Sequence, residues 1–121
     1  MTVGTWALVG VLGGVGAVAR FIVDGLAGER ARGEFPWGTF VVNLTGAALL
    51  GTLVGAAVTG NALVLAGTAT LGSYTTLSTL MLETHRLGQD DQLPIAAANV
   101  LASMFFGFAA VALGHAIGAA L

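Results

Sequence analysis

Side chains able to hydrogen-bond are concentrated in one short segment of an otherwise apolar stretch. Five serine and threonine residues lie between Gly72 and Leu80, in the sequence GSYTTLSTL, within an apolar run from about Leu63 to Leu82. Hydroxyl groups can hydrogen-bond the backbone of their own helix and loosen it. Backbone groups freed at membrane depth are tolerated only where they are buried in protein or line a watery cavity. We therefore expect a broken helix that forms part of an ion pathway.

Other neutral polar residues also lie inside apolar stretches. Asn43 follows Thr39 by one helical turn, and Asn99 precedes Ser103 by one turn, so each pair shares a helix face. An amide group surrounded by hydrocarbon needs hydrogen-bond partners, commonly across a helix interface, so Asn43 either joins helices or lines a pore. Neutral donors suit a small, strongly hydrated anion, whose lost water they replace, while carbonyl groups freed at the break could hold a cation.

Few ionisable residues lie near these polar groups. Arg20 and Glu83 each lie near the end of an apolar stretch, where a charge is costly unless it reaches the interface or finds a partner. We interpret Arg20 either as an interfacial anchor or as a cation at the mouth of a vestibule, and Glu83 as a solvated helix end. His115 has no second histidine at metal-ligand spacing. No acid–base pair, nucleophile motif or phosphate-binding loop is present, so we expect no enzyme activity.

The composition places these residues in a membrane protein. The 121 residues are 56% hydrophobic and 8% charged, with a mean hydropathy of +0.92, whereas a soluble domain carries roughly 25% charged residues. With no cysteine, neither a disulfide nor a thiolate metal site is available, and a net charge of −2 gives no basic surface for nucleic acid. Glycines spaced by four residues indicate close helix packing, at Gly10/Gly14, Gly51/Gly55 and Gly114/Gly118.

The apolar stretches divide into four spans of about 20 residues within one domain, residues 1–121. We expect spans over about residues 5–23, 38–58, 63–82 and 93–118, with polar loops at Asp24–Glu34 and Glu83–Gln92. Thr59–Asn61 separates the second span from the third because Gly and Asn favour turns, and Pro94 suits the first turn of the fourth. The sequence therefore predicts an all-α membrane protein with four transmembrane helices, the third broken near its centre, in a lipid bilayer.

The arginines predict the orientation of the chain. With four spans, both termini lie on one side of the membrane and all the arginines lie on the other, namely Arg20, Arg30, Arg32 and Arg86. Cytoplasmic loops carry an excess of Lys and Arg. We therefore expect the arginine side to be cytoplasmic. The apolar segment Val3–Val23 has no Lys or Arg before it, and its length suits a retained span better than a signal peptide.

Four sequence motifs together resemble the CrcB/Fluc family of fluoride channels. They occur in the order that the family shows and extend through most of the chain: Gly13–Arg20, Gly38–Gly46, Gly72–Leu80 with Glu83 behind it, and Asn99 with Ser103 and Gly107. The resemblance implies a multi-pass protein of the cell membrane that exports fluoride passively. It also implies an antiparallel, dual-topology dimer, in which two subunits are inserted in opposite orientations and the pores lie at the dimer interface.

The resemblance also implies roles for individual residues. The fluoride pathway would be formed by Asn43, Ser78, Thr79, Asn99 and Ser103, together with positions Leu77 and Leu80. Gly72 and Thr75 would offer backbone carbonyl groups to a structural sodium ion on the dimer axis. Arg20 would lie at a vestibule.

The chain departs from the family pattern at Leu77 and Leu80, where the motif normally carries phenylalanine. Aromatic rings have an electropositive edge that can face an anion, and leucine has none. Together with the one-sided arginines, this favours one half of a heterodimer whose oppositely inserted paralogue supplies the phenylalanines, although a homodimer stays open. The alternatives are a non-conducting structural partner of such a paralogue, and a small dual-topology multidrug or metabolite exporter. The exporter would need a membrane-embedded carboxylate, for which Glu83 is the only candidate.

Overall fold

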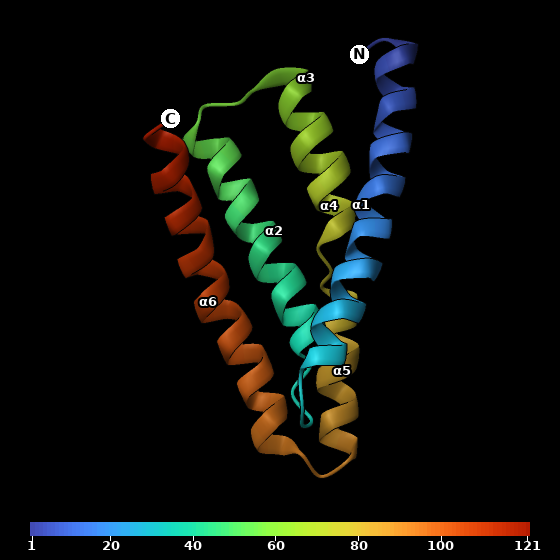
Figure 1. Ribbon diagram of the computed structural model, residues 1–121, viewed down its shortest axis with the longest axis vertical. Helices are drawn as coiled ribbons and strands as arrows, with labels where there is room; N and C mark the ends of the chain where they lie inside the picture. The colour runs from blue at the N-terminus through green and yellow to red at the C-terminus, as the bar shows by residue number, and fades with distance from the viewer.

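The computed structural model describes residues 1–121 as an assembly of helices without strands (Figure 1). Three helices are long and apolar enough to cross a membrane: α1 (Val3–Arg30), α2 (Trp37–Gly55) and α6 (Leu93–Ala119). The fourth crossing is interrupted and consists of α3 (Gly60–Leu63), the π-helix η1 (Val64–Leu71), α4 (Gly72–Tyr74) and α5 (Ser78–Gln89). The protein is therefore a multi-pass membrane protein, and the predicted all-α architecture is confirmed.

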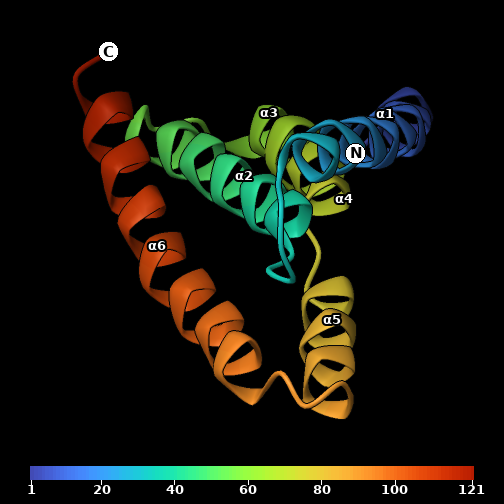
Figure 2. The ribbon, with the colours of Figure 1, turned by 60° about the horizontal axis from the view of Figure 1, so that its bottom comes forward.

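The predicted break in the third crossing is present, at Thr75–Leu77. The backbone of Thr75 is extended, with φ −81° and ψ 161°, and the next helix starts at Ser78. Figure 2 shows that the axis of α5 points in a different direction from that of the segment before the break. A short connection joins the far end of α5 to α6. Helix α5 contacts α6, and α4 contacts α1. The two halves of this crossing thus pack against different partners.

The half that precedes the break is wound more loosely than an α-helix. Thr70 Oγ1 donates to the carbonyl oxygen of Leu65, five residues earlier, at 2.8 Å, and the Gly72 amide donates to the carbonyl oxygen of Gly67. A π-helix is rare and is found mostly at functional sites. The hydroxyl-rich sequence predicted the break but not the π-helix before it.

Both chain termini lie at one end of the molecule, together with the α2–α3 connection (Figure 1). The α1–α2 and α5–α6 connections, which contain or adjoin the loop arginines, lie at the other end. A turn separates the second span from the third, as predicted, but it lies at residues 56–59 rather than at Thr59–Asn61. Gly60, with φ +63°, and Asn61 are already in α3. Pro94 lies in the first turn of α6, as expected.

Both predicted polar loops are largely helical. The segment Glu83–Gln92 was expected to be a loop, but α5 continues through it to Gln89. The polar segment Asp24–Glu34 was expected to be a loop, but α1 continues through it to Arg30. A helix of 28 residues is about 42 Å long at roughly 1.5 Å per residue, which exceeds the hydrocarbon thickness of about 30 Å. The last turns of α1 therefore extend beyond the apolar layer, where charged side chains can be solvated without ending the helix.

Glycines bring α2 and α6 into backbone contact. A Cβ atom at Gly51 would overlap the carbonyl oxygen of Val111, and one at Gly114 would overlap that of Ala48. A Cβ atom at Gly55 would likewise overlap the carbonyl oxygen of His115, and one at Gly118 would overlap that of Thr52. The expectation of close packing is confirmed for these two glycine pairs. It is wrong within this chain for the Gly10/Gly14 pair, because nothing lies within 4 Å of a Cβ atom at either position.

We expect Gly51→Ala to separate α2 from α6 and destabilise the protein. Replacing glycine by alanine inside a helix stabilises the helix by about 1 kcal/mol. Overpacking against a backbone carbonyl costs about 1–3 kcal/mol, and more where the neighbour cannot move. Gly10→Ala is the matched control, with the same helical gain and no clash. Thermal unfolding in detergent should show a lower midpoint for Gly51→Ala only; equal midpoints for the two variants would contradict this packing.

Candidate functional site

Asn43 on α2 holds the broken backbone directly. Its Nδ2 donates to the carbonyl oxygen of Thr76 at 2.8 Å, and its Oδ1 accepts from the Thr76 amide at 2.8 Å. The Thr76 amide and carbonyl groups belong to the two successive peptide units that flank this residue, and a single side chain satisfies both. One Nδ2 hydrogen of Asn43 is left over for a further acceptor. Asn43 therefore joins two segments, and it also faces a cavity lined by the break.

The Thr76 side chain starts the helix that follows the break. Its Oγ1 accepts from the Thr79 amide at 3.2 Å and also contacts Thr79 Oγ1 at 3.2 Å and Ser78 Oγ at 3.3 Å. A hydroxyl that accepts from an amide three residues later is a typical N-cap. It satisfies a group that would otherwise have no partner at the start of α5, and it fixes the direction in which Ser78 and Thr79 leave the backbone.

Tyr74 and Gly46 fix the other side of the break. The hydroxyl of Tyr74 lies 2.8 Å from Thr45 Oγ1, and the tyrosine side chain is buried. Because Thr45 Oγ1 is also 2.8 Å from the carbonyl oxygen of Val41, its own hydrogen goes there and Tyr74 is the donor to Thr45. A Cβ atom at Gly46 would overlap the Thr75 side chain. Glycine at this position lets the break lie against α2.

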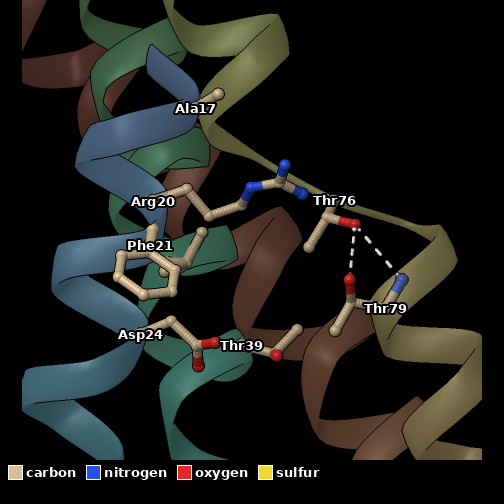
Figure 3. A pocket seen from close by; sticks show the side chains of 8 residues that line it. Ala17, Arg20, Phe21, Asp24, Thr39, Thr76 and Thr79 are labelled. Carbon is tan, nitrogen blue, oxygen red and sulfur yellow. Dashed lines mark hydrogen bonds between the residues drawn. The ribbon is translucent and has the colours of Figure 1, made fainter. Parts of the chain in front are cut away.

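A cavity of about 350 Å³ opens between α1, α2 and the break (Figure 3). Its charged and hydroxyl-bearing lining residues are Arg20, Asp24, Thr39, Thr76 and Thr79, and its apolar ones are Ala17, Phe21 and Val42. Figure 3 shows the Arg20 guanidinium directed toward Thr76 and the Asp24 carboxylate directed toward Thr39. The predicted vestibule position of Arg20 thus lies beside hydroxyl groups of the break.

A second hollow, of about 510 Å³, lies on another side of the break. It is mostly apolar, and the predicted site residues among its lining are Asn43, Gly72, Thr75, Leu77 and Leu80. Thr76 lines both cavities. Thr76, whose backbone is hydrogen-bonded to Asn43, therefore lies between a charged, polar cavity and an apolar one.

Glu83 is not the solvated helix end that was expected. Its Oε1 accepts a short hydrogen bond from Thr39 Oγ1, and Thr39 is only 2% exposed. The contact joins α5 to α2. The sequence could not reveal it, because the direction of α5 after the break decides which helix Glu83 reaches.

Asn99 and Ser103 lie on α6 and face α5 rather than either cavity. Asn99 is fully buried, and its Nδ2 donates to Thr84 Oγ1 at 2.9 Å. Thr84 Oγ1 gives its own hydrogen to the carbonyl oxygen of Leu80 at 2.7 Å, so it can only accept from Asn99. This leaves Asn99 Oδ1, an acceptor, as the free end of the amide.

Two atoms in this region are buried without a hydrogen-bond partner: Asn99 Oδ1 and Ser103 Oγ. A buried polar group left unpaired costs about 1–3 kcal/mol. Such groups in native proteins call for water, an ion or another chain as a partner. These two unpaired atoms belong to residues that the sequence placed on one helix face.

The structure brings only part of the predicted site together. Thr79 and Arg20 line the polar cavity, whereas Asn43, Leu77, Leu80, Gly72 and Thr75 line the apolar one. Ser78 is exposed, Leu77 is 70% exposed, and Leu80 is 8% exposed. Thr84 and Asp24 were missed. Thr76 was noted only as one of the hydroxyl-bearing residues of the break; its spacing to Thr79 is the capping pattern that could have revealed its role.

Comparison with known proteins shows the family of this chain. A family model described as "CrcB-like protein, Camphor Resistance (CrcB)" matches residues 7–115. A protein of Mycolicibacterium paratuberculosis named "Fluoride-specific ion channel FluC 2" is 54% identical over 114 residues, which cover 94% of this chain and 93% of that protein. A protein of the same name from Mycobacterium tuberculosis is 50% identical over 115 residues, covering 95% and 91%. "Fluoride-specific ion channel FluC 1" of Frankia casuarinae is 39% identical over 125 residues, covering 96% and 97%. By the extent of these matches, the chain belongs to the CrcB-like family.

Proposed function

We propose that this chain is a subunit of a fluoride-selective ion channel that lets fluoride leave the cytoplasm passively across the cell membrane. The observation that carries the proposal is the broken crossing, whose hydroxyl groups at Thr76 and Thr79 share a cavity with Arg20. Hydrogen-bond donors and fixed charges that line a pathway decide which ion passes. The names of the relatives, which are 39–54% identical, support fluoride as the ion.

The fluoride pathway is proposed to follow the donors that remain available. Fluoride loses its water only where donors replace it. The hydroxyls of Ser78, Thr79 and Ser103 and the remaining Nδ2 hydrogen of Asn43 can supply such bonds. Thr79 lines the polar cavity, and Ser103 is included because its Oγ has no partner within the chain. Asn99 presents an acceptor on its free end, so we place it beside the pathway, where it positions Thr84 and the turn that carries Leu80.

A structural sodium ion is proposed at Gly72 and Thr75. Hard cations prefer oxygen ligands such as backbone carbonyls. Gly72 is exposed at the apolar cavity, and the extended backbone of Thr75 takes its peptide out of the helical pattern. These residues thus fit the carbonyl ligands that the sequence suggested. When bound between two subunits, the ion would join them.

The apolar cavity is proposed as the face that meets a second subunit in the opposite orientation. Leu77 and Leu80 line it at the positions where the family normally has phenylalanine. Leucine lacks the electropositive ring edge. A paralogous partner that carries the phenylalanines would supply this element across the interface, which favours a heterodimer over a homodimer. The same two leucines favour a second candidate function, that of a non-conducting partner that only supports the fold of the paralogue.

The direct test of the channel proposal is fluoride efflux from liposomes, followed with a fluoride electrode. The chain is reconstituted alone and together with a co-expressed paralogue from the same genome that has phenylalanine at both positions. We expect efflux that spares chloride, and faster efflux from the mixed dimer. No efflux from correctly folded dimer of either kind would contradict the channel proposal and leave the structural-partner function.

We expect Ser103→Ala to slow fluoride efflux without loss of stability. A hydrogen bond to a charged group contributes about 1.5–3 kcal/mol, so removal of a hydroxyl on the pathway should lower the rate by about tenfold or more. The free energy of unfolding should not fall, because Ser103 Oγ has no partner in the folded chain. Ser73→Ala is the matched control, since Ser73 Oγ is bonded to the Ala69 carbonyl. Equal rates for the two variants would remove Ser103 from the pathway.

A further inference from the structure

Asp24 is a charged residue of the polar cavity to which the proposed pathway assigns no role. It lies on α1 one helical turn after Arg20 and lines the same cavity. Its carboxylate lies against α2 at Gly38, where a Cβ atom would overlap Asp24 Oδ1. Gly38 is buried. Glycine at position 38 thus leaves the space on α2 in which the exposed Asp24 side chain lies, at the edge of the cavity.

The two opposite charges of this cavity do not face each other. Figure 3 shows the Arg20 guanidinium directed toward Thr76 on the break, whereas the Asp24 carboxylate is directed toward Thr39 on α2. Both charges project from α1, but each is directed toward a different part of the cavity lining. A fluoride ion that approaches Thr76 and Thr79 is exposed to the attraction of Arg20 and to the repulsion of Asp24 together.

The charged residues that line this cavity are Arg20 and Asp24 alone. Glu83 accepts a hydrogen bond from Thr39 but does not line the cavity. A cleft focuses the field of the charges that line it, and the field changes the rate at which an ion arrives by about 10-fold to 1,000-fold at low ionic strength. Arg20 by itself would make the mouth positive and speed the arrival of anions, and Asp24 offsets that charge.

Resting on the proposed function, we propose that Asp24 limits the rate at which fluoride enters the polar cavity by offsetting the positive potential of Arg20. The effect is electrostatic and acts on access rather than on the hydrogen bonds further along the pathway. It therefore depends on ionic strength, because salt screens charges over about 30 Å at 10 mM but only about 10 Å at 100 mM. A purely structural role of Asp24 would show no such dependence.

The test is fluoride efflux from liposomes that contain the conducting dimer, alone or with the paralogue, with Asp24→Asn in this chain. Asparagine has nearly the same shape, so the contact with Gly38 is kept. We expect efflux about threefold to tenfold faster at about 10 mM salt, with most of the gain lost at about 300 mM. Arg20→Gln should slow efflux at low salt, and the double variant should lie between the two single variants.

The matched control is Asp91→Asn, in the α5–α6 connection at the same end of the molecule as Asp24 but outside the cavity. Asp91 has φ 58°, which asparagine also tolerates. If Asp24→Asn and Asp91→Asn change efflux equally, or if the change does not depend on salt, the inference is wrong. Should Asp24→Asn fail to fold, Asp24→Ser is judged by the same comparison. Wild-type dimer that does not conduct would instead overturn the proposed function, so the two failures are distinct.

Discussion

A chain that breaks inside an apolar bundle must find hydrogen-bond partners for the peptide groups that the break releases, and the rest of this structure depends on how it does so. In hydrocarbon each unpaired group costs several kcal/mol. Asn43 satisfies the Thr76 amide and carbonyl with the two ends of one side chain. This pair of bonds sets the position of the break along α2. The break then becomes a fixed element that can hold hydroxyl groups at a cavity, instead of a frayed loop.

The remaining contacts follow from the position of the break. The Thr76 hydroxyl caps α5, and the resulting direction of α5 brings Glu83 to Thr39 and Thr84 to Asn99. On the other side, Tyr74 is bonded to Thr45. Before the break, the π-helix packs on α1, where a Cβ atom at Gly16 would overlap the Thr70 carbonyl oxygen. Thr76 lines both the polar and the apolar cavity, so these contacts also determine where the two cavities lie.

The sequence predicted those features that depend on local composition. Hydroxyl groups in an apolar run indicated the break, Gly60 and Asn61 indicated the turn between the second and third crossings, and Pro94 indicated the start of α6. The contacts that assemble the site were not predictable, because they join residues far apart in the chain. Asn43 and Thr76 are separated by 33 residues, and Thr39 and Glu83 by 44. The charged end of α1 was mistaken for a loop because polarity marks both solvated helices and loops.

The account rests on the bonds between Asn43 and Thr76, and hydrogen–deuterium exchange at the Thr76 amide in lipid nanodiscs tests them most directly. Thr76 lines both cavities, so we expect water beside it and expect the hydrogen bond to Asn43 to protect its amide. We predict slow exchange in the wild type, much faster exchange in Asn43→Leu, and no change in the control Asn61→Leu, in α3. Fast exchange in the wild type, or equal exchange in wild type and Asn43→Leu, would contradict the central claim.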